Sequence, residues 1–177
     1  MRTCYFLLPA EPFYTEFQET IRQLARELNA PVFEPHVTVF VAHESPEDNA
    51  SAILHRVTAH LCPLLLTAAE YAWTPMYTKS LFLEFDADAS LTQLHATLRK
   101  LSAMPTNYEL RPHLSMAYKQ MTPDLQENIA RELAVPRSLI RFDRMKAVRV
   151  PDQIESPGEV ESWVTLAECA LACEPVA

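Results

Sequence analysis

The sequence predicts an α+β protein in which a unit of strand, helix, strand, helix and strand occurs twice and one further strand closes the chain. Short apolar runs bounded by proline or polar residues alternate with segments whose apolar residues recur at spacings of three and four. The first pattern is typical of β-strands and the second of amphipathic helices. Matching features also lie 77 positions apart, as Pro46 and Pro123 do, so the two units are expected to be structural repeats.

Local patterns predict five elements in the first half. An apolar run that ends at Pro9 and a row of alternating valines predict two strands, and apolar residues on one helical face predict the helix between them. Ser45 and Pro46 are typical of a helix start, because serine caps a helix and proline fits its first turn. The expected elements are strands at 4–8, 37–41 and 64–73 and helices at 13–28 and 45–61.

The second half repeats this order. Thr122 and Pro123 predict another helix start, and Pro157 and Gly158 predict a turn before the closing strand. The expected elements are strands at 81–85, 113–118, 138–150 and 160–171 and helices at 91–101 and 122–133. No linker separates the halves. We therefore expect one two-lobed domain over 1–177, with repeat halves at about 3–74 and 77–150, a closing strand at about 160–172 and a cleft between the lobes.

The glycine content restricts how the protein can bind phosphate. Gly158 is the only glycine among 177 residues, where average usage gives roughly twelve. Phosphate-binding loops and dinucleotide folds need several glycines, because the backbone must approach phosphate closely. A G-x-S-x-G nucleophile elbow is excluded for the same reason. If the protein binds phosphate, its side chains must do so.

Charge and hydropathy restrict the partners and the compartment. Fifteen Lys and Arg against 23 Asp and Glu give a net charge of −8, which argues against a stable complex with duplex nucleic acid. No apolar run approaches the roughly 20 residues that span a membrane, and the run before Pro9 is too short for a signal peptide. We therefore expect a cytoplasmic monomer with no membrane partner and with all four cysteines reduced.

Two short segments in register contain the candidate chemistry. The pattern Pro-His-aliphatic-hydroxyl occurs at 35–38 and again at 112–115, 77 positions later. Because residues i and i+2 of a strand share a face, each histidine lies beside the hydroxyl residue two positions after it. If the halves are related by a pseudo-twofold axis, the two pairs face each other across the cleft. The candidate catalytic residues are His36, Thr38, His113 and Ser115.

These groups suit the acid–base hydrolysis of a phosphodiester without a metal or another cofactor. One imidazole can take the proton of an attacking water while the other protonates the departing oxygen. The hydroxyls can donate hydrogen bonds to the non-bridging phosphate oxygens. Imidazoles with an ordinary pKa of about 6.5 predict a bell-shaped dependence of rate on pH between about 5 and 8.

The paired H-x-T/S motifs, each near the start of a strand in a duplicated fold, resemble those of the two-histidine phosphoesterase superfamily. Within it, the chain is most similar to the plant-type cyclic phosphodiesterases. The shared features are the opening Phe6-Leu7-Leu8-Pro9, a proline before each histidine, a tyrosine five residues after the second histidine and a late Glu161-Ser162-Trp163. The resemblance spans essentially the whole chain. It implies a bilobal pseudo-twofold fold with antiparallel sheets lining a central cleft and helices outside.

The same resemblance implies a function and a set of site residues. It implies hydrolysis of a small-molecule cyclic phosphate, such as a nucleoside 2′,3′-cyclic phosphate or ADP-ribose 1″,2″-cyclic phosphate, to a phosphomonoester, with the catalytic roles at the four motif residues. It places Phe6 and Tyr118 in the cleft, although strict alternation from His113 turns Tyr118 to the core unless the strand bends or bulges. The aromatic stretch before the middle strand corresponds to Tyr77-Thr78-Lys79. There we favour Tyr77 for base stacking and Lys79 for contact with phosphate.

Two other functions stay open at this point. One is an RNA 2′-5′ ligase or RNA-end phosphodiesterase of the same superfamily, and the other is a non-enzymatic module that binds cyclic phosphates. Trp73 and Trp163 are expected to be core residues on strands. The histidines without a partner at metal-ligand spacing are expected to be structural or surface residues; these are His43, His55, His60 and His95.

Overall fold

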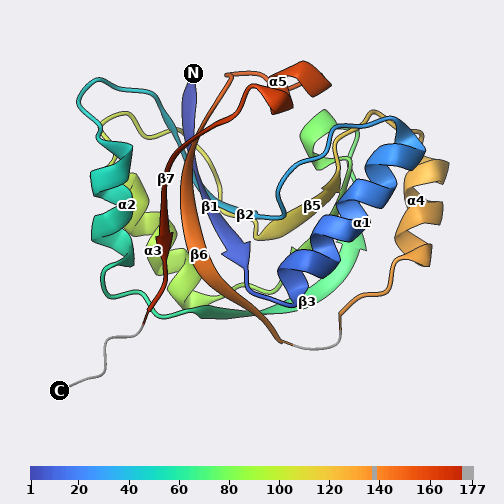
Figure 1. Ribbon diagram of the computed structural model, residues 1–177, viewed down its shortest axis with the longest axis horizontal. Helices are drawn as coiled ribbons and strands as arrows, with labels where there is room; N and C mark the ends of the chain where they lie inside the picture. Colours follow the sequence, from blue (N-terminus) through green and yellow to red (C-terminus); the bar gives the residue numbers. More distant parts are fainter. Residues whose placement is uncertain (137–138, 173–177) are drawn as a thin grey trace.

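Seven strands and five α-helices alternate along the part of the chain that the computed structural model describes, residues 1–136 and 139–172 (Figure 1). This arrangement confirms the predicted α+β class. The strands are β1 (Arg2–Pro9), β2 (Val37–His43), β3 (Leu64–Ala72), β4 (Leu81–Phe85), β5 (His113–Ala117), β6 (Leu139–Val150) and β7 (Val164–Ala170). The helices are α1 (Phe13–Leu28), α2 (Ala50–Thr58), α3 (Ala89–Leu101), α4 (Pro123–Glu132) and α5 (Pro157–Glu161), and a 3-10 turn, η1 (Tyr77–Lys79), precedes β4. Residue 138, the predicted start of the sixth strand, lies outside the described residues.

The strands form one antiparallel sheet in the order β1-β2-β5-β4-β3-β6-β7, and β1 also pairs with β6. The resemblance implies more than one sheet, and the long β6 is the reason for the difference. Leu139–Phe142 of β6 pair with β3, whereas Phe142–Val150 pair with β1 on one side and Arg144–Arg149 with β7 on the other. A strand of this length runs through both halves of the molecule and joins what would otherwise be two sheets.

The strand pairing has a twofold pattern. When β1, β2 and β3 are exchanged with β4, β5 and β6, the β1–β2 pairing becomes the β4–β5 pairing and the β1–β6 pairing becomes the β4–β3 pairing. The β2–β5 and β3–β6 pairings are unchanged by the exchange. This pattern agrees with the repeated unit that the sequence predicts.

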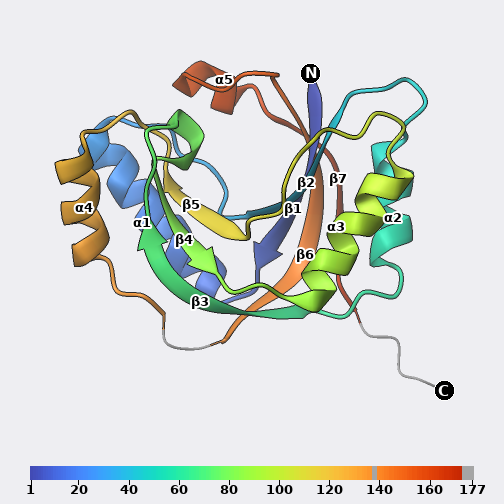
Figure 2. The same ribbon diagram turned by 180° about the vertical axis from the view of Figure 1, so that it is seen from behind.

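The helices lie on the outside of the sheet. Figures 1 and 2 show α1 and α4 on one side of the molecule, α2 and α3 on the other, and α5 at the end where the chain begins. Helix α3 packs against β2 and α1 against β5, so each long helix contacts a strand of the other half. None of the helices in the described ranges has the length and apolar character that crossing a bilayer requires. The predicted apolar faces of α1 and α3 are buried in the core, at Phe17, Ile21 and Leu24 and at Leu91, Leu94 and Leu98, whereas Leu125 on the predicted face of α4 is exposed.

The second helix begins at Ala50, not at Ser45 as predicted. Asn49 caps it by accepting a hydrogen bond from the backbone N–H of Ala52 at 3.0 Å. The Ser45 hydroxyl instead accepts from the backbone N–H of Glu47 within a turn. Serine and asparagine are comparable as helix caps, so the sequence is compatible with a helix start at either residue. Because the Ser45 hydroxyl is used in the turn, the helix begins after Asn49.

A short helix replaces the turn and the strand start predicted near Gly158. Ser156 and Glu159 form a capping box, in which the Glu159 carboxylate accepts from the backbone N–H of Ser156 at 2.9 Å. This Ser-x-x-Glu signature favours a helix over the turn. The closing strand therefore begins at Val164. A Cβ added at Gly158 would meet no atom within 4 Å and the residue has no positive φ, so neither space nor backbone conformation requires a glycine there.

Two predictions about single side chains are wrong. Trp73 is 37% exposed rather than buried, because β3 ends one residue before it and the indole lies in the following loop. Cys4 and Cys169 are free and buried, as predicted, but Cys62 is disulfide-bonded, and it lies in the exposed loop between α2 and β3. A local pattern does not show that such a loop cysteine has a partner. Cys173 lies outside the described residues.

Candidate active site

Strands β2 and β5 meet at one residue pair, which brings the two histidine motifs together. Val37 pairs with Leu114, and both side chains are fully buried. Because side chains alternate along a strand, the residues on either side of this pair point to the opposite face of the sheet. The four residues on that face are His36, Thr38, His113 and Ser115.

The four motif side chains line one cavity of about 550 Å³. Continuing the antiparallel register by one residue in each direction places His36 across from Ser115 and Thr38 across from His113. Each half of the chain therefore supplies one imidazole and one hydroxyl, and each imidazole lies across from the hydroxyl of the other half. The structure brings together all four residues that the sequence predicts.

Each imidazole is fixed by the backbone two residues before it. Nδ1 of His36 lies 2.6 Å from the carbonyl oxygen of Glu34, and Nδ1 of His113 lies 2.6 Å from the carbonyl oxygen of Arg111. A carbonyl oxygen only accepts hydrogen bonds, so Nδ1 has the proton of each neutral ring. Nε2 of each ring is therefore unprotonated and free to react.

Burial lowers the pKa of both imidazoles to about 4. For His36, which is 5% exposed, burial outweighs the raising effect of its hydrogen bond to the Glu34 backbone. For His113, burial is again the main cause, and the charges of Lys79 and His36 add to it. Both rings are neutral at pH 7 in the ligand-free protein, so each Nε2 presents a lone pair.

The two hydroxyls have different surroundings. Within the described residues, the Thr38 hydroxyl has no hydrogen-bond partner, whereas the Ser115 hydroxyl donates to the carbonyl oxygen of Thr78 at 3.0 Å. Burial raises the pKa of the neighbouring Tyr118, so its phenol stays protonated. Of these two hydroxyl protons, that of Thr38 is free among the described residues for an incoming phosphate, whereas Ser115 must rotate before it can donate.

A β-bulge follows the hydroxyl residue in both strands. The register of β1 with β2 skips Val39, and the register of β4 with β5 skips Met116, which lies 77 positions later. The second bulge shifts the alternation by one residue and turns Tyr118 to the cavity wall. The structure therefore contains the irregularity that a cleft position of Tyr118 requires.

A phenylalanine on the neighbouring strand packs against each imidazole. Phe6 stacks on His36 with ring centroids 3.8 Å apart and 23° between the planes, and Phe82 meets His113 edge-on at 5.2 Å. These contacts restrict the rotation of both rings. Phe6 was predicted from the sequence and Phe82 was missed, although its position 76 residues after Phe6 was a usable signal.

Trp163 packs, partly buried, against the hydrophobic core as predicted, but it also lines the cavity. It lies in the turn before β7, with its ring centroid 5.7 Å from that of Phe6 and 5.9 Å from that of His36. Its Nε1 is buried and has no hydrogen-bond partner among the described residues. Tyr108, also missed, lines the cavity and donates its hydroxyl proton to the carbonyl oxygen of Thr38 at 3.0 Å. No local pattern distinguishes these aromatic residues from core residues.

The turn η1 brings Lys79, but not Tyr77, to the cavity wall. The Lys79 Nζ lies 4.8 Å from the ring centroid of Phe82, and burial, followed by the nearby Arg111, lowers its pKa. The ring centroid of Tyr77 lies 6.4 Å from that of Tyr118, outside the cavity lining. Base stacking by Tyr77 stays a prediction that this geometry does not support.

Lys79 is the cation of the cavity that no carboxylate neutralises within the described residues. Arg2 is paired with Asp152 at 3.6 Å and Arg111 with Glu109 at 3.4 Å, whereas Lys79 has no ion pair in the same ranges. An unpaired ammonium beside His113 suits a ligand with negative charge. No group of three or more His, Cys, Asp or Glu in the described chain is arranged to hold a metal ion.

Gln126 of α4 holds the loop that contains η1. It is 2% exposed, and its Nε2 donates to the carbonyl oxygens of Thr74 at 2.9 Å and Ser80 at 2.8 Å. Gln126→Leu leaves both carbonyls unpaired and is expected to lower the free energy of unfolding by about 2 kcal/mol in urea denaturation. The matched control is Gln23→Leu on the exposed face of α1, where the lost bond goes only to Glu27. It is expected to cost less than about 0.5 kcal/mol, and equal losses in the two variants would contradict this role of Gln126.

Comparisons with known proteins show which family and which fold the chain resembles. The family model of the 2′-5′ RNA ligase superfamily matches residues 7–150. The Arabidopsis thaliana protein named cyclic phosphodiesterase is 22% identical over 169 residues, which cover 93% of this chain and 92% of that protein. Among solved structures, TT0787 of Thermus thermophilus has a TM-score of 0.63 at 18% identity and covers 99% of this chain and 100% of its own. Escherichia coli LigT complexed with 3′-AMP has a TM-score of 0.59 at 16% identity and covers 96% of this chain and 97% of its own.

The family match spans both histidine motifs and most of the chain. It confirms the resemblance that the motifs indicate, and the two structural similarities confirm the mixed α+β fold. The chain therefore belongs to the 2′-5′ RNA ligase superfamily of two-histidine phosphoesterases.

Proposed function

We propose that the protein is a cyclic phosphodiesterase that hydrolyses nucleoside 2′,3′-cyclic phosphates or ADP-ribose 1″,2″-cyclic phosphate to phosphomonoesters. One observation carries the proposal: one buried and one partly exposed imidazole line one cavity, each with Nδ1 against a backbone carbonyl at 2.6 Å and Nε2 free. Such a pair can supply a base and an acid to one phosphorus atom. The name of the Arabidopsis relative supports cyclic phosphates as the substrate class.

Substrate binding prepares the two imidazoles for different tasks. The negative charge of the cyclic phosphodiester raises the pKa of the imidazoles that it contacts, so one of them takes up a proton. The neutral imidazole then removes a proton from water as the water oxygen forms a bond to phosphorus. The bond from phosphorus to one ester oxygen breaks, and the imidazolium protonates that oxygen. One phosphomonoester and one free hydroxyl result, and no step uses a metal ion.

The other cavity groups stabilise the charge on the phosphate. The Thr38 hydroxyl can donate to a non-bridging oxygen directly, because its proton has no partner within the described residues. Ser115 can do so after its proton leaves the Thr78 carbonyl oxygen. Lys79, which lacks a carboxylate partner in the described chain, adds positive charge beside His113. These side chains perform the task that glycine-rich backbone performs in other phosphate sites.

A product assay in EDTA tests the proposal. The purified protein is expected to convert 2′,3′-cyclic nucleotides, or ADP-ribose 1″,2″-cyclic phosphate, to phosphomonoesters that ³¹P NMR identifies. The rate is expected to be the same with and without EDTA. Failure to hydrolyse any cyclic phosphate would contradict the function, and loss of activity on chelation would contradict the metal-free mechanism.

The salt dependence of the same assay separates a small substrate from an RNA end. One cyclic phosphate makes few ionic contacts, so kcat/KM is expected to change little between about 50 and about 200 mM salt. By contrast, a protein that contacts about 6–10 phosphates loses about 10³–10⁵ in affinity over the same range of salt concentration. A steep loss with salt, together with a preference for RNA that ends in a 2′,3′-cyclic phosphate, would favour the RNA-end phosphodiesterase instead.

A further inference from the structure

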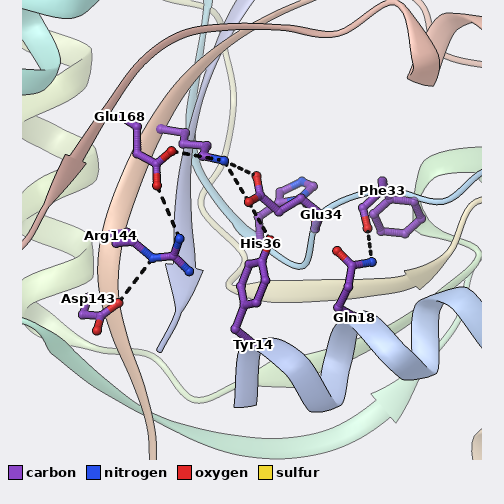
Figure 3. Close-up of polar contacts among 9 residues, drawn as sticks. Tyr14, Gln18, Phe33, Glu34, His36, Asp143, Arg144 and Glu168 are labelled. Atoms are coloured by element: carbon purple, nitrogen blue, oxygen red, sulfur yellow. Dashed lines mark hydrogen bonds and ion pairs between the residues drawn. The ribbon is translucent and has the colours of Figure 1, made fainter. Parts of the chain in front are cut away.

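The Glu34 carboxylate lies in a network of ion pairs beside His36 (Figure 3). Its Oε1 accepts a hydrogen bond from the Tyr14 hydroxyl at 2.9 Å, and both of its oxygens lie 2.8 Å from Nζ of Lys146. The side chain of Lys146 is only 14% exposed, and its Nζ also lies 3.3 Å from Glu168. A half-buried carboxylate is thus held from α1 and from β6.

The rest of the network fixes these partners in turn. Glu168 accepts from Arg144 at 3.4 Å, and the Arg144 guanidinium lies 4.9 Å from the ring centroid of Tyr14. In the register of β1 with β6, Lys146 pairs directly with Phe6, the residue that stacks on the His36 ring. Lys146, which holds the Glu34 carboxylate, therefore lies directly across from the residue that packs on the His36 imidazole.

The second histidine has the same backbone contact without this anchor. Its Nδ1 also lies 2.6 Å from a carbonyl oxygen two residues earlier, that of Arg111. The Arg111 side chain is 75% exposed, and its ion pair is with Glu109, which is 80% exposed, at 3.4 Å. Surface ion pairs of this kind contribute little to stability. The two halves therefore support their imidazoles differently.

We propose that Lys146 is a positioning residue for His36: by holding the Glu34 carboxylate, it fixes the backbone carbonyl that keeps the imidazole proton on Nδ1 and leaves Nε2 free. Pro35 restricts the Glu34 backbone to an extended conformation. When the Glu34 side chain is also held in place, the orientation of the Glu34 backbone carbonyl is fixed. The consequence for turnover rests on the proposed function, whereas the consequence for the His36 tautomer does not.

The charges of the pair have opposite effects on His36. Glu34 raises the pKa of the imidazole and Lys146 lowers it. Removing Lys146 leaves the carboxylate uncompensated and raises this pKa, whereas removing the Glu34 charge leaves the ammonium and lowers it further. The other titratable groups around His36 and this pair are Tyr14 on α1, His113 on β5, Tyr118 after β5, and Glu168 on β7 beyond Lys146.

Four variants test the proposal in the cyclic phosphodiesterase assay. Lys146→Met is expected to lower kcat roughly tenfold to a hundredfold with little change in KM, and to move the alkaline limb of kcat/KM to higher pH. Glu34→Gln is expected to move that limb to lower pH. Lys146→Arg is expected to restore most of kcat, because a guanidinium can bind the same carboxylate. The matched control is Arg149→Met, which removes a cation of the same strand that pairs with Glu44 and lies outside both the cavity and this network, and it is expected to change neither kcat nor the alkaline limb of kcat/KM.

Long-range ¹H–¹⁵N NMR of the imidazoles gives a readout without substrate. His36 is expected to be the Nδ1–H tautomer in the wild type and a mixture of tautomers in Lys146→Met, with thermal unfolding as the check that each variant is folded. If the wild type hydrolyses no cyclic phosphate, the proposed function fails, and the NMR spectra still decide the role of Lys146. An unchanged tautomer in Lys146→Met would overturn it. The proposal would also be overturned if the alkaline limb of kcat/KM moved in the same direction in Lys146→Met and in Glu34→Gln.

Discussion

Replacing either catalytic histidine by alanine is expected to lower kcat on a 2′,3′-cyclic nucleotide by about 10³-fold, within the range of 10²–10⁴ that a positioned acid or base contributes. In His36→Ala and in His113→Ala, one proton transfer must go through water, because no other described side chain replaces the lost imidazole as acid or base. The double variant is expected to lose little more than either single variant, because the two imidazoles act as one unit.

Three measurements make the histidine result specific. His60→Ala is the control, since that imidazole is exposed beyond α2 and outside the cavity, and its kcat is expected to equal that of the wild type. The product nucleotide is expected to bind both cavity variants in calorimetry, because Thr38, Lys79 and the aromatic wall stay in place. Thermal unfolding shows whether the lost packing against Phe6 matters. Full activity in either cavity variant would contradict the two-histidine mechanism.

The motif residues could be predicted because their information is local. Alternation around Val37 and Leu114 shows which residues share a face, and the 77-residue offset shows that the two faces belong together. The need for a bulge before Tyr118 also followed from alternation, and the register of β5 contains it at Met116. In each case a period of two or a fixed offset was sufficient.

The anchor of His36 could not be predicted because it depends on register between distant strands. Lys146 is 112 residues from Glu34, and the β1–β6 register brings them together. In the sequence, Lys146 belongs to a basic segment at 137–149 that is more typical of a solvated strand face than of a binding site. Trp163 is similar, because its place at the cavity depends on α5, whose capping box displaces the start of the last strand.

The lowered pKa values of both imidazoles are expected to make kcat/KM fall as pH rises from about 5 to about 7. The free enzyme reacts in the form with one neutral and one protonated imidazole, and both pKa values are lowered to about 4. Above these values that form becomes about tenfold rarer with each pH unit, so kcat/KM is expected to fall roughly 100-fold over this range. Imidazoles with an ordinary pKa of about 6.5 would instead give a maximum inside it.

The dependence of kcat on pH is expected to differ from that of kcat/KM. In the complex, the phosphate anion lies against the imidazoles and raises their pKa, so the alkaline limb of kcat lies at higher pH than that of kcat/KM. KM must then rise with pH between the two limbs. Initial rates across this range, at several substrate concentrations and constant ionic strength, measure both limbs. A kcat/KM that is flat or rises from about pH 5 to about 7 would show that the buried imidazoles of the ligand-free protein do not control the reaction.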